Sequence, residues 1–244
     1  MFKKKSETVK LFYNKYLYCG HFNNPLSGIL RDKSLVYAKS ILDILYNTFD
    51  KDNPNKSKDH LLPVWINELI DSNQLNLQHI QDASIIYKTL SNTTSEYCTR
   101  QVFQPRPYPS VIFSHVRLYT NDLELLNTLA KNVKCAYELM APNPKDMHIL
   151  ANNPNSIICK NTAYKYKIRF NHNKLHPNFL PWYSNNKDKI KIPYLCLSDL
   201  RRYGRIENRF IYVKDDNTLT LLNLMIDKSI SRIYECISPS TLDK

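Results

Sequence analysis

Carboxylates recur at matching places in two stretches of the chain. The stretches Val116–Pro142 and Arg209–Pro239 share the pattern Leu-x-Leu-Leu-Asn followed by Tyr-Glu-x-x-x-Pro. Asp122 and Asp216 each precede the leucine-rich part of this pattern. Two carboxylates from equivalent units could hold Mg²⁺, so a metal-dependent nuclease is one hypothesis. The simpler interpretation, which we favour, is that each aspartate caps the helix that starts beside it.

The other side chains that could do catalytic chemistry are weaker candidates. Glu138 and Glu235 follow the repeated tyrosines and fit solvent-facing strand positions paired with Lys or Arg. His172 and His176 have a spacing that lets two histidines of a helix share a metal, but the Asn and Pro residues around them indicate a loop. The sequence therefore predicts no catalytic residue and no metal site.

Glycine is rare, and this limits the classes of enzyme that the chain could form. Loops that cradle phosphates need several glycines close together, and the whole chain has three. Neither a P-loop nor a dinucleotide-binding fingerprint can be written with them. We expect a protein that is not an enzyme and that uses no cofactor.

Cations are concentrated in the second half of the chain. The net charge is +12, and the segment 160–214 contributes ten of these charges, with thirteen Lys and Arg against three acids. Aromatic residues are interleaved with the cations. Cations neutralise phosphates and aromatic faces stack on unpaired bases, so we expect a nucleic-acid partner, single-stranded or RNA. The residues predicted to contact it are Lys165, Lys167, Arg169, Lys187, Lys189, Lys191, Arg201, Arg202 and Arg205.

The stretch Ala163–Phe170 shows how such a surface could be built. Its residues alternate between two kinds, which predicts a strand with two different faces. Tyr164, Tyr166, Ile168 and Phe170 would share one face, and Lys165, Lys167 and Arg169 the other. We expect the first set to be core and the second to point outward, so that the cations contact phosphates without base stacking.

Three functions remain open, and we rank them. The first is a non-enzymatic nucleic-acid-binding protein that contacts phosphates through 160–214. The second is a structural or assembly component of a virion or ribonucleoprotein complex, in which the basic segment contacts other subunits. The metal-dependent nuclease comes third. A content rich in Asn, Lys, Ile and Tyr is typical of AT-rich genomes, as in many phages, viruses and organelles.

The cysteines and the apolar runs bear on where the chain is found. Six widely spaced cysteines without a Cys-x-x-Cys motif favour buried thiols in a reducing, intracellular compartment: cytoplasm, nucleoid or virion. No apolar run approaches the ~20 residues of a membrane span, and the N-terminus lacks the apolar core of a secretory signal. We therefore expect no membrane partner.

The elements that must position these residues predict an α+β fold. We expect two tandem small α/β units, interpreted as a duplication, each a mixed or antiparallel sheet with helices packed on one face. Their predicted extents are 1–142 for an N-terminal unit, 143–159 for a connecting loop and 160–244 for a basic C-terminal unit. The aromatic stretch Val9–Cys19 is predicted to be a strand, opening the first unit as Ala163–Phe170 opens the second.

Periodicity and breakers predict the remaining elements that we use below. Apolar residues at helical spacing predict helices over Leu35–Phe49, Leu77–Leu90 and Tyr194–Tyr203, the last ended by Gly204. Polar and Pro-containing residues predict a linker over Asp50–His60. Three prolines predict an extended segment over Gln104–Ser110.

Overall fold

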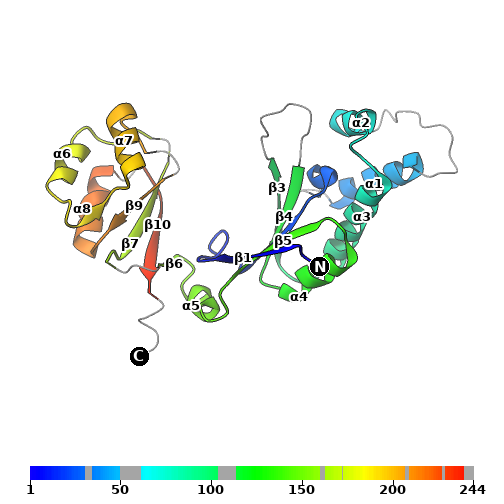
Figure 1. Cartoon of the computed structure of the whole chain (residues 1–244), viewed down its shortest axis with the longest axis horizontal. Coiled ribbons are helices and arrows are strands. Elements are labelled where there is room, and N and C mark those ends of the chain that lie inside the picture. Colours follow the sequence, from blue (N-terminus) through cyan, green and yellow to red (C-terminus); the bar gives the residue numbers. More distant parts are fainter. Residues whose placement is uncertain are drawn as a thin grey trace. The chain divides into compact units, whose positions relative to one another are not determined.

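The computed structural model describes most of the chain. The described residues are 1–30, 35–49, 62–103, 114–159, 163–171, 173–206, 209–226 and 229–238. The chain divides into two compact units, the first made of Met1–Thr8 and Lys15–Pro142, the second of Val9–Asn14 and Asn143–Lys244. Within the described ranges each unit has helices and one five-stranded mixed sheet (Figure 1), which confirms an α+β fold with two tandem units.

The first unit contains a sheet with the strand order β1-β5-β2-β4-β3. Strand β1 pairs in parallel with β5, and the other neighbours pair antiparallel. Its elements are β1 (Lys4–Thr8), β2 (Tyr18–Phe22), the 3-10 helix η1 (Pro25–Gly28), α1 (Leu35–Phe49), α2 (Val64–Asp71), α3 (Leu77–Asn92), β3 (Tyr97–Phe103), β4 (Ser114–Thr120), α4 (Leu123–Asn132) and β5 (Ala136–Pro142).

The second unit contains a sheet with the strand order β6-β10-β7-β9-β8. Strand β6 pairs in parallel with β10, and the other neighbours pair antiparallel. Its elements are α5 (Met147–Asn152), β6 (Ser156–Ile158), β7 (Tyr166–Phe170), α6 (Phe179–Ser184), β8 (Ile190–Lys191), α7 (Tyr194–Tyr203), β9 (Phe210–Val213), α8 (Asp216–Ile226) and β10 (Ile230–Ile237).

The two sheets follow one plan. Numbered within its own unit, each sheet has the order first, fifth, second, fourth, third, and in each the first and fifth strands form the parallel pair. The repeated leucine-rich pattern lies in α4 and α8, and each of these helices joins the fourth strand to the fifth. The shared plan supports the interpretation of the sequence repeat as a duplication.

The helices predicted from apolar periodicity are present. Helix α1 has the predicted bounds Leu35–Phe49, and α3 extends two residues beyond the predicted Leu90. Helix α7 ends at Gly204, as predicted. In the part of the chain that the structure describes, no helix is long and apolar enough to cross a membrane. The predictions over Asp50–His60 and Gln104–Ser110 lie outside the described residues.

Two local predictions are wrong. Val9–Cys19 is not one strand: Tyr13 and Asn14 have φ values of 55° and 57°, in the left-handed region, and the paired strand β2 begins only at Tyr18. The left-handed Tyr13 and Asn14 interrupt the stretch, because a β-strand cannot contain this backbone conformation. Its aromatic residues Tyr16 and Tyr18 are buried. The predicted connecting loop 143–159 contains α5 and β6, both too short to give a periodic signal, and β6 pairs with β10.

The core of the second unit lies between its sheet and three helices. Ile168 of β7 and Ile211 of β9 are opposite each other in register and fully buried. They belong to one apolar cluster with helix residues Phe179 of α6, Leu200 of α7 and Leu222 of α8. Helices α6, α7 and α8 therefore pack on the same face of the sheet (Figure 1).

The end of α7 gives a direct test of the local backbone. Gly204 has φ 66° and donates its N–H to the Leu200 carbonyl over 2.9 Å, and a Cβ added there would meet no atom within 4 Å. Gly204→Ala is therefore expected to cost about 1 kcal/mol of unfolding free energy, from the left-handed conformation alone. Gly204→Asn should cost less, because asparagine tolerates this region. Urea denaturation measures the unfolding free energy of both variants. Equal losses of unfolding free energy would contradict the left-handed conformation of Gly204.

Candidate nucleic-acid interface

Strand β7 has two faces with different surroundings. Ile168 and Phe170 are buried in the cluster shared with the helices, as predicted. Successive side chains of a strand point to opposite faces, so Lys167 and Arg169 point away from α6, α7 and α8. Both cations are half-buried. The strand thus presents cations on the face that its helices do not use.

Strand β9 places aromatic rings beside these cations. Ile211 and Val213 are buried in the core, which puts Phe210 and Tyr212 on the same face as Lys167. The Lys167 ammonium lies 4.2 Å from the centroid of the Phe210 ring and 5.6 Å from that of Tyr212. Both rings are half-buried. Cations and aromatic faces, which the sequence predicted to be separated, here share one surface.

The neighbouring strands extend this surface in both directions. Lys191 of β8 is opposite Tyr212, and Arg232 of β10 is opposite Arg169. Both side chains are exposed. We call the resulting surface the cationic sheet face, and its residues are Lys167, Arg169, Lys191, Phe210, Tyr212 and Arg232. This set holds four cations and no carboxylate.

The segment Val9–Asn14 covers the β10 end of the cationic sheet face. The Lys10 ammonium donates to the Tyr234 hydroxyl over 3.2 Å and lies 4.7 Å from the centroid of its ring. Asn14 accepts a hydrogen bond of 3.1 Å from Arg232. Tyr234 is only 2% exposed, so its ring is held inside the unit, while Lys10 adds a further cation at this end.

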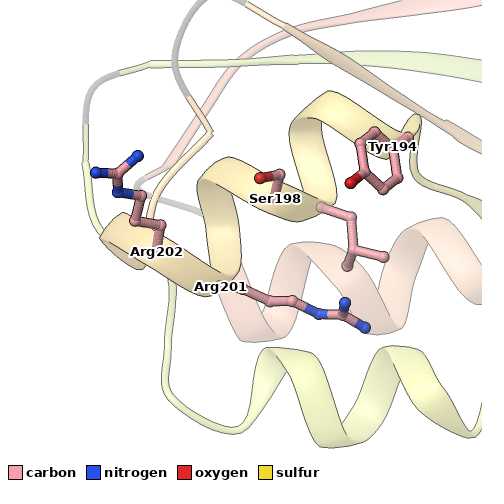
Figure 2. Close-up of a pocket in the computed structure, with 5 residues that line it drawn as sticks. Tyr194, Ser198, Arg201 and Arg202 are labelled. Carbon is pink, nitrogen blue, oxygen red and sulfur yellow. The ribbon is translucent and has the colours of Figure 1, made fainter.

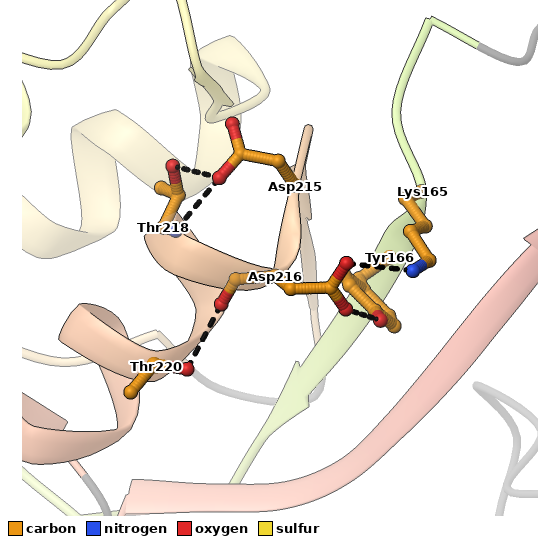
Figure 3. Close-up of polar contacts among 6 residues, drawn as sticks. All are labelled: Lys165, Tyr166, Asp215, Asp216, Thr218 and Thr220. Carbon is orange, nitrogen blue, oxygen red and sulfur yellow. Dashed lines mark hydrogen bonds and ion pairs between the residues drawn. The ribbon is translucent and has the colours of Figure 1, made fainter.

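Lys165 was predicted to contact phosphate, but its ammonium has a carboxylate partner. Its ammonium lies 2.7 Å from Asp216 Oδ2, and the Tyr166 hydroxyl donates to the other oxygen of the same carboxylate (Figure 3). These two donors hold the pKa of Asp216 below its ordinary value. The charge of Lys165 is therefore balanced within the unit.

The other predicted cations lie outside the cationic sheet face. Lys187 and Lys189 are exposed in the turn that leads into β8. Arg201 and Arg202 are exposed in the last turn of α7, and Arg205 follows that helix. Since α7 packs against the opposite face of the sheet, the nine predicted residues do not form one continuous surface.

Helix α7 carries a second surface of mixed character. A depression of about 300 Å³ is lined by Tyr194, Leu197, Ser198, Arg201 and Arg202 (Figure 2). Tyr194 is 81% exposed and Leu195 is 59% exposed, which are large fractions for apolar side chains. A shallow site lined by a single helix suits contact with another macromolecule better than enclosure of a small substrate.

The repeated aspartates act mainly in local structure. Asp122 caps α4 by accepting from the Leu125 N–H over 2.9 Å, as predicted. In α8 the cap is Asp215, which accepts from both the N–H and the hydroxyl of Thr218 over 2.8 Å (Figure 3). The predicted cap Asp216 lies one residue further on, in the first helical turn. Asp215, directly before α8, occupies the place that Asp122 has before α4.

The remaining candidates for metal chemistry are dispersed. Glu138 accepts a hydrogen bond from the Ser6 hydroxyl and lies 3.1 Å from the Lys4 ammonium, whereas Glu235 is exposed. His176 is exposed in a loop, and His172 lies outside the described residues. Over the described ranges, no group of three or more His, Cys, Asp or Glu side chains could hold a metal ion.

A row of ionisable side chains crosses the sheet of the first unit, which the sequence did not predict. One residue from each strand stands in register on one face. In sheet order they are Lys4, Glu138, His21, Arg117 and Arg100. His115, two residues from Arg117 on β4, shares the face, and its ring centroid lies 4.0 Å from that of His21.

Burial dominates the electrostatics of the two histidines. His21 is 5% exposed and His115 is 2% exposed. Both nitrogens of His21 and Nε2 of His115 have no hydrogen-bond partner among the described residues. Burial, the neighbouring His21 and the charge of Arg117 lower the pKa of His115 to about 4. Because these nitrogens are buried, a substrate cannot reach them. We therefore interpret the pair as groups that affect the unfolding free energy of the first unit.

The cationic sheet face combines four cations with two aromatic rings on one surface. Its cations can neutralise an anion and its two rings can stack on planar groups. The sequence predicted Lys167, Arg169 and Lys191 but missed Phe210, Tyr212 and Arg232. The alternation of Phe210–Val213 was the available signal for the two rings. Comparison of the chain with models of protein families, with curated proteins and with solved structures gives no match.

Proposed function

We propose that the chain is a non-enzymatic protein that binds single-stranded nucleic acid on the cationic sheet face. The observation that carries this proposal is the position of Lys167, which lies over Phe210 and close to Tyr212, with Arg169 and Lys191 on the same face. A backbone that tracks the cations would bring its bases over the two rings.

The four cations of this face suit a phosphate backbone. Lysine and arginine that contact phosphates release condensed counterions, so affinity falls with salt in proportion to the number of contacts. Four contacts to a single strand correspond to a slope of about −3 for log K against log salt. The ammonium of Lys167 would exchange its contact with Phe210 for a phosphate and uncover the ring.

The two rings favour a single strand over a duplex. Unpaired bases expose their π faces, whereas a duplex keeps them stacked on one another. Phe210 and Tyr212 are both half-buried, so they are held rigidly and can stack with little loss of conformational freedom. RNA and DNA share the phosphates and the bases that this face would contact.

The test is a titration of the whole chain against labelled single-stranded and duplex RNA and DNA of equal length at 50 and 200 mM salt. We expect the single strands to bind more tightly, with affinity falling about 50-fold between the two salt concentrations. Equal and negligible binding of all four probes would remove the proposal.

The six cysteines agree with an intracellular, reducing setting for this function. All six are free thiols. Cys19 and Cys196 are buried among apolar residues, where they pack as small hydrophobic side chains. We propose the cytoplasm, a nucleoid or a virion interior as the compartment.

Assembly into a larger complex is the second candidate, and the exposed apolar residues favour it. Tyr194 and Leu195 of α7 and Leu224 of α8 are 81%, 59% and 79% exposed. Association through such residues would persist at high salt, unlike contact with phosphates. Tyr194→Asp with Leu195→Asp should disrupt assembly with other subunits and leave nucleic-acid binding unchanged.

A further inference from the structure

Two cysteines far apart in the sequence come together at the β6–β10 pair. Cys236 of β10 is opposite Ile157 in the parallel ladder, and the N–H of Cys159 donates to the Ile237 carbonyl over 2.9 Å. Alternation then puts both cysteine side chains on one side of the pair. Both residues are half-buried, so small reagents can reach them.

The surroundings of this thiol pair favour the thiolate of Cys159. The Cys236 thiol donates a hydrogen bond to it, which outweighs burial, and the charge of Lys167 adds to the effect. Together these lower the pKa of Cys159 to about 7, whereas the same hydrogen bond, with burial, raises the pKa of Cys236. At neutral pH about half of Cys159 is therefore thiolate, the nucleophilic form of cysteine.

Other cysteines of the chain have the opposite character. Burial raises the pKa of Cys19 to about 12, and burial also raises the pKa of Cys196. Cys98 is half-buried like the pair and serves as a control matched in exposure. The opposite directions of these pKa shifts distinguish Cys159 from the buried thiols Cys19 and Cys196 of the same chain.

We propose that Cys159 and Cys236 form a peroxide-reactive dithiol, in which Cys159 attacks and Cys236 resolves. The Cys159 sulfur attacks one oxygen of hydrogen peroxide, the O–O bond breaks, and hydroxide leaves and takes up a proton to become water. The sulfur, now a sulfenic acid, has been oxidised by two electrons. The Cys236 sulfur then attacks it, an S–S bond forms, the S–O bond breaks, and hydroxide leaves with the Cys236 proton as a second water.

This inference stands on the thiol pair and does not rest on the proposed function. Lys167 nevertheless belongs to both sites, because its charge acts on the thiols and it lies in the cationic sheet face. The Cys159 thiolate is a counter-charge to Lys167, and disulfide formation would remove it. Oxidation would then leave Lys167 more attractive to an anion.

The experiment uses the reduced full-length chain at pH 7. One equivalent of hydrogen peroxide is added, remaining thiols are blocked with a maleimide, and the product is mapped as peptides without reduction. We expect two of the six thiols to be lost and a single disulfide joining Cys159 to Cys236. Loss of thiols with a different pairing, or linkage between two chains, would overturn the proposal.

Alkylation rates in the wild-type chain test the same pair without oxidation. With iodoacetamide at pH 7, Cys159 of the wild-type chain should react about tenfold faster than Cys98, because the pKa of Cys159 is lowered to about 7. Cys236→Ala should slow Cys159 about tenfold and leave a sulfenic acid that dimedone traps after peroxide. Equal rates for Cys159 and Cys98 in the wild-type chain would refute the assignment.

Discussion

Replacing Lys167 by glutamate is expected to weaken the binding of a single-stranded oligonucleotide about 30-fold at 100 mM salt. The substitution removes one phosphate contact and places a carboxylate opposite Tyr212, on the same face as Arg169, so the loss corresponds to about 2 kcal/mol. The slope of log K against log salt should also become less steep, by the contribution of about one phosphate contact. Fluorescence anisotropy at several salt concentrations measures both quantities.

The control must separate a local contact from the effect of net charge. Lys88 is exposed on α3 in the first unit, and Lys88→Glu changes the net charge by the same amount. We expect this variant to bind within about twofold of the wild-type chain, because Lys88 is not part of the cationic sheet face and salt screens exposed charges that make no direct contact. Equal weakening by Lys88→Glu and Lys167→Glu would mean that binding follows overall charge and has no site on β7.

The rings make a contribution that charge reversal does not test. Phe210→Ala should weaken single-strand binding by about 1–3 kcal/mol for a stacked base, with an unchanged salt slope, since no phosphate contact is lost. Duplex binding should change little in the same variant. A change in the slope, or an equal loss for duplex and single strand, would contradict the assigned role of the ring.

Acidification from pH 7 to pH 4 is expected to lower the unfolding free energy of the first unit by about 3 kcal/mol through His115. Its pKa falls from the ordinary 6.5 to about 4 in the folded chain. Below pH 6.5 the unfolded chain therefore binds a proton that the folded chain does not, and stability falls with pH until about pH 4. Burial and the charge of Arg117 lower the pKa of His21 as well, which adds to the loss.

The pH effect has an internal control in the same row. The groups that face His115 are His21 and Arg117, with Glu138 beyond His21. Glu138 and His79 also have lowered pKa values and add a loss of the same sign, so the test compares the slope of the wild-type chain with that of one variant. His115→Phe keeps a ring in the site and should remove about one proton from the slope of stability against pH. Urea denaturation at half-unit pH intervals gives the slope. An unchanged slope would show that His115 is already protonated in the folded chain.

The sequence predicted the ends of helices and the faces of strands where the signal lies within one element. The apolar stripe of Leu35–Phe49 gave both ends of α1, and Gly204 gave the end of α7, because these signals are local. The alternation around Ile168 gave the buried and outward sides of β7 for the same reason. The prediction of one strand over Val9–Cys19 was wrong because a stretch rich in aromatic residues can pack without pairing in a sheet. The left-handed residues Tyr13 and Asn14 are not glycines, so the sequence did not indicate the turn.

The candidate sites could be predicted only in part, because they depend on which strands are neighbours. The sequence shows that Lys167 and Arg169 point the same way, but not that Phe210 and Tyr212 lie beside them. That fact depends on the β7–β9 register, which joins residues more than forty positions apart. The row through His21 and the pair of Cys159 with Cys236 depend on register in the same way, since each draws on distant strands.

Photo-crosslinking shows which residues of the chain contact unpaired bases, which we expect on the cationic sheet face. Single-stranded RNA containing 4-thiouridine is irradiated with the full-length chain, and the crosslinked residues are identified by mass spectrometry. We expect crosslinks at Phe210 and Tyr212, lost when excess unlabelled single strand is added. Crosslinks confined to α7 or to the first unit, with none on β9, would contradict it.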